Sequence, residues 1–253
     1  MNTPFVVIIP ARLASTRLPR KPLADIGGQP MIVRVAKRAL LSAATEVIVA
    51  TDSEEIAKVC EQHQIKVVLT RADHPTGTDR LGEVAIKLNL DPQAIVVNVQ
   101  GDEPFIPPEL INQVAQTLAQ NTHCAIATAG LHIDDASEID NPNVVKIAIA
   151  KNGQALYFSR APIPYLRDAQ TQIHQRCTRH IGIYAYRAAF LSQFASLEPA
   201  PIEQAEALEQ LRALWHGFHI QVMITPEAPP PGIDTPEDLA RAQEEWGKIE
   251  LSR

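Results

Sequence analysis

The stretch EVIVATDSEEIAKVCEQHQIKVVLT, residues 46–70, contains a complete strand–helix–strand unit. Its two ends, EVIVAT and IKVVLT, are continuous runs rich in Val and Ile, which are typical of strands covered on both faces. Between them Ser53 is suited to cap a helix, and Glu54 and Glu55 place acidic side chains in its first turn. The stretch therefore predicts two buried strands joined by a helix.

The same alternation continues on both sides of this unit. FVVII (residues 5–9) and AIVVNV (residues 94–99) are further buried-strand patterns, while MIVRVAKRALLSA (residues 31–43) and DRLGEVAIKL (residues 79–88) repeat apolar residues at helical spacing. The series predicts an α/β protein with an open, mostly parallel sheet flanked by helices on both faces.

After about Leu118 the pattern changes. Two alternating runs meet at Asn152 and Gly153, a pair typical of hairpin turns, and HIGIYAYR (residues 180–187) alternates again. We expect a smaller mixed or antiparallel extension of the sheet in this part of the chain.

Two more helices are predicted near the C-terminus. The first is one long helix over residues 202–217 that ends at Gly217. The second is a closing helix over residues 235–249, capped by Thr235 with Pro236 at its first helical position.

The composition narrows the class of protein. The 253 residues carry a net charge of −6, which argues against a nucleic-acid binder. No run approaches the roughly 20 apolar residues that span a bilayer, so no membrane insertion is expected, and the N-terminal apolar run is too short for a secretion signal. The three cysteines are scattered without a CxxC pair, which indicates a reducing compartment and favours a cytoplasmic protein.

A basic loop follows the first strand, in IIPARLASTRLPRKPL (residues 8–23). The first forty residues contain seven Lys or Arg and one acid, the opposite of the overall balance. Long loops in compact domains are usually functional, and we expect Arg12 and Lys21 together to bind phosphates, assisted by backbone donors of the helix that begins near Pro30. Neither GxxxxGK[ST] nor GxGxxG is present, and Arg17 and Arg20 are interpreted as solvated.

Two other polar segments fall at expected strand ends, where open α/β sheets bind ligands. In TRADHPTGTDR (residues 70–80), Gly77 permits close backbone approach and Thr78 offers hydrogen bonds, although a helix-capping turn with Thr78 or Asp79 as cap explains the segment equally well.

Asp102 directly follows the strand in VVNVQGDEP, where a carboxylate is well placed to hold Mg²⁺. Asp234, in PGIDTPEDL, is a candidate second carboxylate. Each also has a plain interpretation, Asp102 as a turn acid and Asp234 as the residue before a helix cap, and spacing leaves these alternatives open.

Eight segments together resemble the 3-deoxy-manno-octulosonate cytidylyltransferases, or CMP-Kdo synthetases, across essentially the whole chain. They are IPARLASTRLPRKPL, TRADHPTGTDR, VNVQGDEP, NPNVVK, LYFSRAPIPY, RHIGIYAYR, EALEQLRALWHG and GIDTPEDL. The sequence departs from this family at Arg20, where the family usually has glycine.

The resemblance implies a nucleotidyltransferase-type fold and a homodimer in which CTP and Kdo give CMP-Kdo and pyrophosphate for lipopolysaccharide synthesis. It implies three parts: a nucleotide-binding core (residues 1–120), a sugar-binding and dimerisation region (residues 121–225) and a C-terminal segment that returns to the core (residues 226–253).

The resemblance also assigns roles to single residues. Lys21, Asp102 and Asp234 are implied to be catalytic, and the two aspartates to hold Mg²⁺. Arg12 and Lys21 match triphosphate contacts. The residues that match the surroundings of the nucleoside are Arg71, Ala72, Gly77 and Thr78. The residues that match the lining of the sugar site are Gln100, Arg160, His180, Tyr184, Glu209 and Gln210.

Within that mechanism, the anomeric hydroxyl of Kdo attacks the α-phosphorus of CTP in line, and Arg160 is the expected partner of the sugar carboxylate. Two alternatives remain: a cytidylyltransferase for another acidic sugar, such as sialic acid or an amino-Kdo, and a nucleotide-binding homologue without catalysis. A glycosyltransferase is disfavoured because no D-x-D-like motif lies near Asp102.

Overall fold

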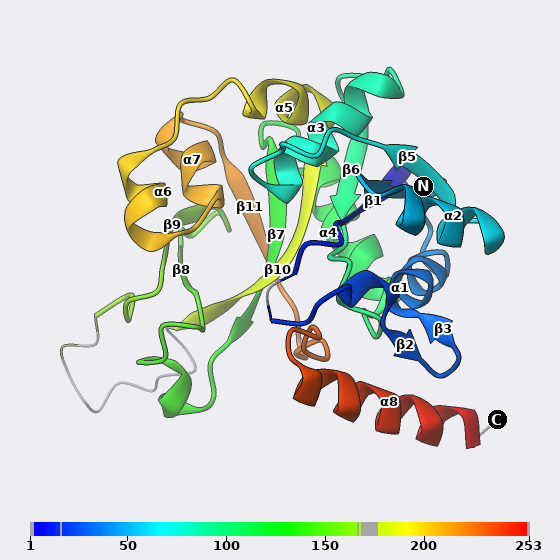
Figure 1. Ribbon diagram of the computed structural model, residues 1–253. Helices are drawn as coiled ribbons and strands as arrows, with labels where there is room; N and C mark the ends of the chain where they lie inside the picture. Colours follow the sequence, from blue (N-terminus) through cyan, green and yellow to red (C-terminus); the bar gives the residue numbers. More distant parts are fainter. Residues whose placement is uncertain (1–2, 16, 166, 168–176, 252–253) are drawn as a thin grey trace.

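The computed structural model describes residues 3–15, 17–165, 167 and 177–251. Within these residues the principal sheet contains nine strands, with the order β11-β7-β10-β6-β1-β4-β5 and a β8–β9 hairpin attached to β10 (Figure 1). The strands of this sheet are β1 (Phe5–Ala11), β4 (Glu46–Thr51), β5 (Lys66–Leu69), β6 (Ile95–Asn98), β7 (Ile126–His132), β8 (Lys146–Ile149), β9 (Ala155–Ser159), β10 (Thr178–Arg187) and β11 (Ile220–Ile224).

The core of the sheet is parallel, and its extension is mixed, with antiparallel pairs around β10 and a parallel pair of β11 with β7. β1 pairs in parallel with both β4 and β6, and β5 pairs in parallel with β4. β10 runs antiparallel to β6, β7 and β8, and the β8–β9 hairpin turns around Asn152 and Gly153. The mostly parallel α/β fold with an antiparallel extension, predicted from the alternating patterns, is confirmed. The main sheet continues across residue 120, and the division into parts at residues 120 and 225 stays a prediction.

Helices cover both faces of the sheet. They are α1 (Met31–Ala39), α2 (Glu54–Gln62), α3 (Gly77–Lys87), α4 (Pro108–Gln120), α5 (Ala188–Phe194), α6 (Pro201–Glu206), α7 (Gln210–Trp215) and α8 (Pro236–Leu251). Two 3-10 turns, η1 (Lys21–Leu23) and η2 (Ala136–Glu138), and a small hairpin of β2 (Asp25–Ile26) and β3 (Gln29–Pro30) complete the elements.

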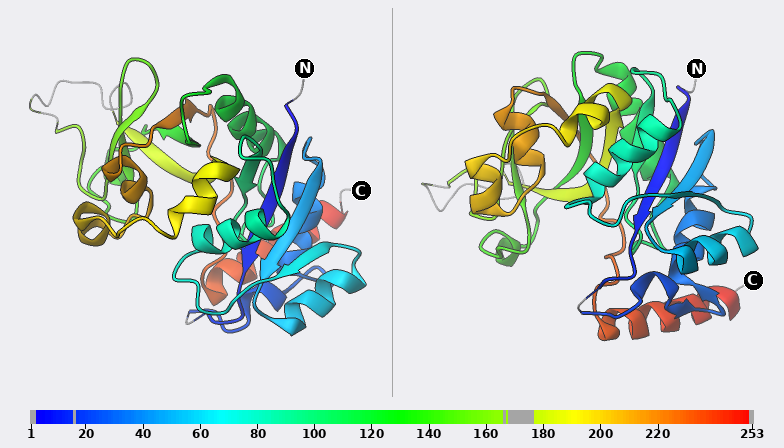
Figure 2. Two further views of the ribbon diagram at one scale, coloured as in Figure 1. Left: turned by 90° about the horizontal axis from the view of Figure 1, so that it is seen from above. Right: turned by 45° about the horizontal axis from the view of Figure 1, so that its top comes forward.

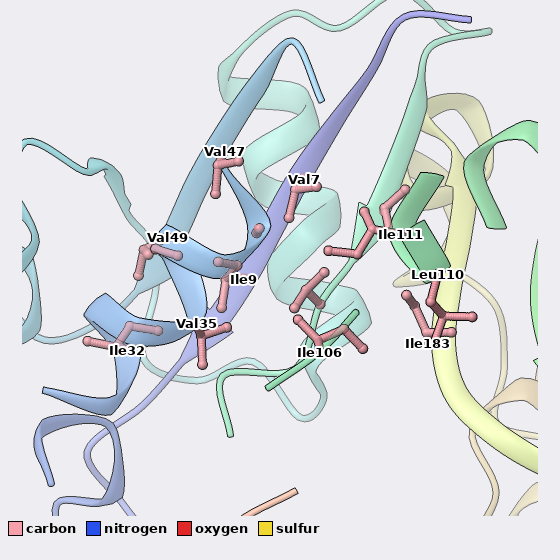
Figure 3. Packing of buried hydrophobic residues seen from close by; sticks show 14 of the residues in the cluster. Val7, Ile9, Ile32, Val35, Val47, Val49, Ile106, Leu110, Ile111 and Ile183 are labelled. Carbon is pink, nitrogen blue, oxygen red and sulfur yellow. The ribbon is translucent and has the colours of Figure 1, made fainter. Parts of the chain in front are cut away.

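Alternation along β1 divides the core into two layers. Val7 and Ile9 face one layer, with residues of α1, α2 and α4, and Ile8 faces the other, with residues of α3, α5 and α7. Figure 3 shows the first layer, which includes Val7 and Ile9 of β1 and Val35 of α1. Because successive strand side chains point to opposite faces, a continuous apolar strand requires helices on both sides.

The C-terminal helix α8 packs beside the small β2–β3 hairpin, which comes from the N-terminal part of the chain (Figure 2). The predicted cap is confirmed, since the Asp238 amide donates to Thr235 Oγ1 at 3.2 Å and Pro236 begins the helix. Among the described residues, no helix is both long and apolar enough to cross a membrane.

The long helix predicted over residues 202–217 is wrong in one respect, because the structure has two short helices, α6 and α7, in its place. The chain turns at Ala207, which has a left-handed conformation with φ 49°. Helical periodicity continues through the break, so the pattern alone predicted one helix. The end at Gly217, with φ 80°, is as expected.

Candidate functional site

A cavity of about 390 Å³ lies beyond the carboxyl ends of β1 and β6. Its lining comes from the basic loop after β1, the turn before α3, the segment after β6 and Asp234. The carboxyl ends of parallel strands meet at one edge of a sheet, which explains why these separate segments converge.

Lys21 lies at the centre of this cavity between two carboxylates. Its Nζ donates to Asp102 Oδ2 at 2.6 Å and to Asp234 Oδ1 at 2.9 Å. Burial lowers the pKa of Lys21, but the attraction of Asp102 and Asp234 outweighs this and raises the pKa above its ordinary value. The three residues that the resemblance implied to be catalytic are therefore in direct contact.

Backbone contacts hold the two aspartates together. The Ile233 amide donates to the Asp102 carbonyl at 2.9 Å, which places Asp234 beside Asp102. Asp234 directly precedes Thr235, the cap of α8. Its amide donates to Asp238 Oδ2 at 3.0 Å, which fixes the backbone of Asp234 against the helix. Gly101 is needed for the approach of the two strand ends, because a Cβ there would lie 2.8 Å from the Pro10 carbonyl oxygen.

Three arginines add positive charge to the cavity. Arg12 and Arg17 come from the basic loop and Arg80 from the first turn of α3. Arg17 pairs with Asp234 at 3.1 Å, so it lies in the cavity rather than only in solvent as the sequence had suggested. Arg80 is almost fully buried, with its guanidinium 3.2 Å from Asp52.

Arg20 occupies a position where the backbone favours glycine. Its φ of 58° and ψ of 27° are in the left-handed region, which a side chain other than glycine adopts at a cost. This is a physical reason for the glycine that the resemblance leads us to expect at this position. The Arg20 guanidinium forms an ion pair with Glu55 of α2, and the Lys21 turn that follows keeps its contacts with Asp102 and Asp234.

The turn before α3 joins two cavities. Thr76 is the N-cap of α3 and forms a capping box with Asp79, so the cap is neither of the two residues considered from the sequence. Gly77 lines both the large cavity and a second one of about 200 Å³. Arg71 and Ala72 are exposed and are not among the lining residues, and their expected contact with the nucleoside stays a prediction.

The second cavity brings together four of the residues expected at the sugar site. Gln100, Tyr184, Glu209 and Gln210 line it, and Gln100 also lines the large cavity. Aromatic and aliphatic side chains from β7, β10, α5 and α7 complete the lining together with Gly77, Thr78 and Asn98. A mainly apolar pocket with a few polar groups is typical of a small-molecule site.

Glu209 and its neighbours form the polar side of this second cavity. Burial raises the pKa of Glu209, and the neighbouring Thr78 and Thr76 side chains oppose this shift. Burial likewise raises the pKa of Tyr186, and the neighbouring Thr78 and Asn98 side chains oppose this shift. The break between α6 and α7 directly precedes Glu209, so the irregular backbone there brings this carboxylate to the two threonines.

Arg160 and His180 are not among the lining residues of either cavity. The Arg160 guanidinium donates to the carbonyls of Glu206 at 2.7 Å and Pro142 at 2.9 Å. His180 contacts Thr128 Oγ1 through Nε2 at 3.0 Å, and burial lowers its pKa to about 3. Their roles in sugar binding stay predictions.

Asp102 and Asp234 fit a magnesium ion by their chemistry. Both carboxylates already share one cationic group, the Lys21 ammonium, so this place favours positive charge. Among the described residues there is no cluster of three or more His, Cys, Asp or Glu that would form a complete protein cage. Mg²⁺ is commonly held by one or two carboxylates together with substrate phosphates, which matches this pair.

Two basic side chains of the lining, His74 and Arg80, were not considered in the sequence analysis. His74 and Arg80 both line the large cavity, one before and one after the Thr76 cap. In a helix capped by Thr76, Gly77 and Arg80 are three residues apart and lie on the same side. With the cap placed at Thr76, the sequence would therefore have indicated that Arg80 faces the cavity together with Gly77. His74 has no comparable signal, because its position depends on how the loop folds back on α3.

The fold and the two joined cavities define an α/β protein with a charged site at the ends of its parallel strands, and comparison with known proteins specifies its class. The sequence profile of the cytidylyltransferase family matches residues 6–222. A 3-deoxy-manno-octulosonate cytidylyltransferase from Polynucleobacter asymbioticus is 64% identical over 243 residues, which cover 96% of each chain. The protein of the same name from Polynucleobacter necessarius subsp. necessarius is 62% identical over 95% of this chain and 94% of its own. The chain belongs to the 3-deoxy-manno-octulosonate cytidylyltransferase family.

Solved structures agree with this assignment. The structure of a CMP:2-keto-3-deoxy-manno-octonic acid synthetase complexed with CTP has a TM-score of 0.91 and 41% identity, and the match covers 98% of this chain and all of that one. A cytidylyltransferase from Leptospira borgpetersenii has a TM-score of 0.58 and 16% identity over 98% of this chain and 95% of its own, and shares the fold.

Proposed function

We propose that this protein transfers CMP from CTP to the anomeric hydroxyl of 3-deoxy-D-manno-octulosonate (Kdo), giving CMP-Kdo and pyrophosphate. The observation that carries the proposal is the pair of joined cavities, in a chain 64% identical to a protein named for this reaction. One cavity is lined by cations and the Asp102–Asp234 pair, and the other by aromatic and polar side chains that include the partly buried Glu209. The product is the activated sugar for lipopolysaccharide synthesis.

The larger cavity has the charge that a nucleoside triphosphate requires. Arg12 and Lys21 lie on the loop after β1 and are suited to the triphosphate, because cationic donors form strong hydrogen bonds with phosphate oxygens. Gly77 and Thr78, at the start of α3, place the nucleoside next to the second cavity. Gln100 lines both cavities, so we expect the α-phosphate of CTP to bind near it, where the two cavities meet.

The reaction is an in-line displacement. The sugar hydroxyl oxygen forms a bond to the α-phosphorus while the bond to the bridging oxygen of pyrophosphate breaks, and the hydroxyl proton is released. Asp102 and Asp234 hold Mg²⁺, which stabilises phosphate charge when it is bound. Lys21 and Arg12 stabilise the negative charge of the departing pyrophosphate, and Gln100, Tyr184, Glu209 and Gln210 orient the sugar.

The discriminating experiment is pyrophosphate release with CTP, Mg²⁺ and one acidic sugar at a time. We expect turnover with Kdo to exceed turnover with sialic acid or an amino-Kdo. Faster release with another acidic sugar would reassign the substrate, and no release with any of them, from a protein that binds CTP, would indicate a homologue without catalysis.

We further propose a homodimer in the cytoplasm. Leu156 of β9 and Trp215 of α7 are 64% and 55% exposed on neighbouring elements, which supports an apolar contact with a second copy of the chain. All three cysteines are free and buried, which is consistent with a reducing compartment. Light scattering on the protein and on Leu156→Asp tests the dimer, which the substitution is expected to weaken.

A further inference from the structure

The loop between β5 and α3 is fixed at both of its ends. At one end, the Thr70 amide donates to the Thr51 carbonyl at 2.8 Å. At the other end, Thr76 caps α3. Residues 74–77 line the large cavity, so the path of this loop sets part of the cavity wall.

One carboxylate, from Glu83 of α3, holds the middle of this loop. Its Oε2 accepts the Arg71 amide at 3.0 Å and also contacts His74 Nε2. Its Oε1 pairs with Lys87 at 2.8 Å on the following turn of the helix. Glu83 itself is absent from the cavity lining, whereas His74 is part of it.

The surroundings keep this carboxylate charged and tightly held. The Glu83 side chain is only 15% exposed and the His74 side chain 9%. Burial raises the pKa of Glu83, but the hydrogen bonds from Lys87, His74 and the Arg71 amide outweigh it and lower the pKa to about 2. A carboxylate with several donors and little water restricts the groups that it contacts, because each loses its hydrogen bond if it moves.

The contact also fixes the imidazole. A carboxylate accepts hydrogen bonds, so His74 donates from Nε2, and this bond sets the ring orientation within the cavity wall. The same oxygen holds the backbone at Arg71, in the segment expected beside the nucleoside. One side chain thereby orients a lining side chain and the backbone three residues before it.

We infer that Glu83 is a positioning residue for the nucleotide site, acting through His74 and the Arg71 backbone to hold the loop of residues 70–76 in its binding conformation. The inference rests on the proposed function, because the ligand of this wall is taken to be CTP. Glu83 does not touch the substrate in this role. Its effect is expected on CTP affinity and much less on Kdo.

The test compares Glu83→Ala with Glu46→Ala as a matched control. Glu46 of β4 also pairs with a lysine, Lys66, but it is not part of the cavity lining. CTP affinity is measured by calorimetry in the presence of Mg²⁺, and the KM values of CTP and Kdo by pyrophosphate release. We expect Glu83→Ala to raise the Kd of CTP about tenfold, the KM of Kdo less than about twofold, and Glu46→Ala to change neither.

A second set of variants separates positioning from folding. His74→Gln keeps an amide nitrogen close to the position of Nε2, whereas His74→Ala removes the donor. We expect His74→Gln to retain more CTP affinity than His74→Ala. Because Glu83 acts through His74, the losses in Glu83→Ala and His74→Ala are expected to be less than additive in the double variant.

The outcomes are distinct. Wild-type protein that neither binds CTP nor releases pyrophosphate would refute the proposed function. Wild-type protein that binds CTP, with folded Glu83→Ala and His74→Ala variants whose Kd stays within twofold of it, would overturn this inference alone. Equal increases in the KM of CTP and Kdo would also overturn it, because they would indicate general disruption. If Glu83→Ala does not fold, the two His74 variants decide the question.

Discussion

The Lys21 ammonium joins Asp102 and Asp234, with Nζ–O distances of 2.6 and 2.9 Å, in the cavity that also contains Arg12. Three segments that are distant in sequence thereby meet at one group. The ammonium partly offsets the charges of the two carboxylates and lies next to the expected position of the triphosphate.

Lys21→Ala is expected to raise the KM of CTP by about 10- to 100-fold, because a hydrogen bond between charged groups contributes about 1.5–3 kcal/mol. The fold should remain, since Lys21 lies on a loop and its partners are partly exposed. Steady-state kinetics and circular dichroism measure both effects. A folded variant with wild-type KM for CTP would remove Lys21 from the triphosphate site.

Asp102→Asn and Asp234→Asn are each expected to reduce turnover at least about 100-fold and to change its dependence on Mg²⁺ concentration. The double variant should lose little more than either single one, because both carboxylates serve one site. The kcat at a series of Mg²⁺ concentrations provides the measurement. Fully multiplicative losses would contradict a shared ion.

Arg160→Lys is expected to raise the KM of Kdo more than that of CTP. Lysine keeps the charge but cannot reproduce the fork of donors, one of which bonds the Glu206 carbonyl at 2.7 Å close to the break before Glu209. The KM of each substrate, measured at saturation of the other, tests this. An unchanged KM for Kdo would show that Arg160 neither contacts the sugar nor positions the backbone beside the sugar site.

The buried His180 is expected to make the protein less stable in acid. Its pKa is about 3 in the folded state and about 6.5 when it is unfolded, so the unfolded chain binds more protons between these values. Stability from this group is present above pH 6.5 and is lost as the pH falls below it, by roughly 2 kcal/mol at pH 5. Urea unfolding at pH 7.5 and pH 5 should show the loss, and His180→Gln should reduce it. An equal pH dependence in the variant would contradict this origin.

Gly82 and Gly247 provide a matched pair in two helices. At Gly82 a Cβ would lie 2.6 Å from the Leu191 carbonyl oxygen, where α3 packs against α5. Gly82→Ala is therefore expected to lower the free energy of unfolding by about 1–3 kcal/mol, as for other overpacked sites. At Gly247 of α8 nothing lies within 4 Å of the added Cβ, and alanine should stabilise by about 0.5–1 kcal/mol. Denaturant unfolding measures both, and equal signs for the two variants would contradict the packing argument.

The sequence by itself determined the layers of the fold. Runs such as residues 47–50 are apolar at every position, and burial on both faces is the only way to remove such a strand from water, so parallel strands and flanking helices follow from local pattern. It also indicated the loop with Arg12 and Lys21 and the strand-end position of Asp102, because both follow directly from where strands stop.

Only the tertiary structure decided how these residues meet. Asp234 reaches Asp102 because the backbone at Ile233 bonds the Asp102 carbonyl, and no periodicity records a contact between such distant segments. The turn at Ala207 that presents Glu209, and the bond from His74 to Glu83, likewise depend on packing and backbone geometry. The local pattern of apolar residues depends on which side of an element must avoid water, so it can be read from the sequence. The chemistry of the site depends on contacts between distant segments, and these form only when the whole chain is packed.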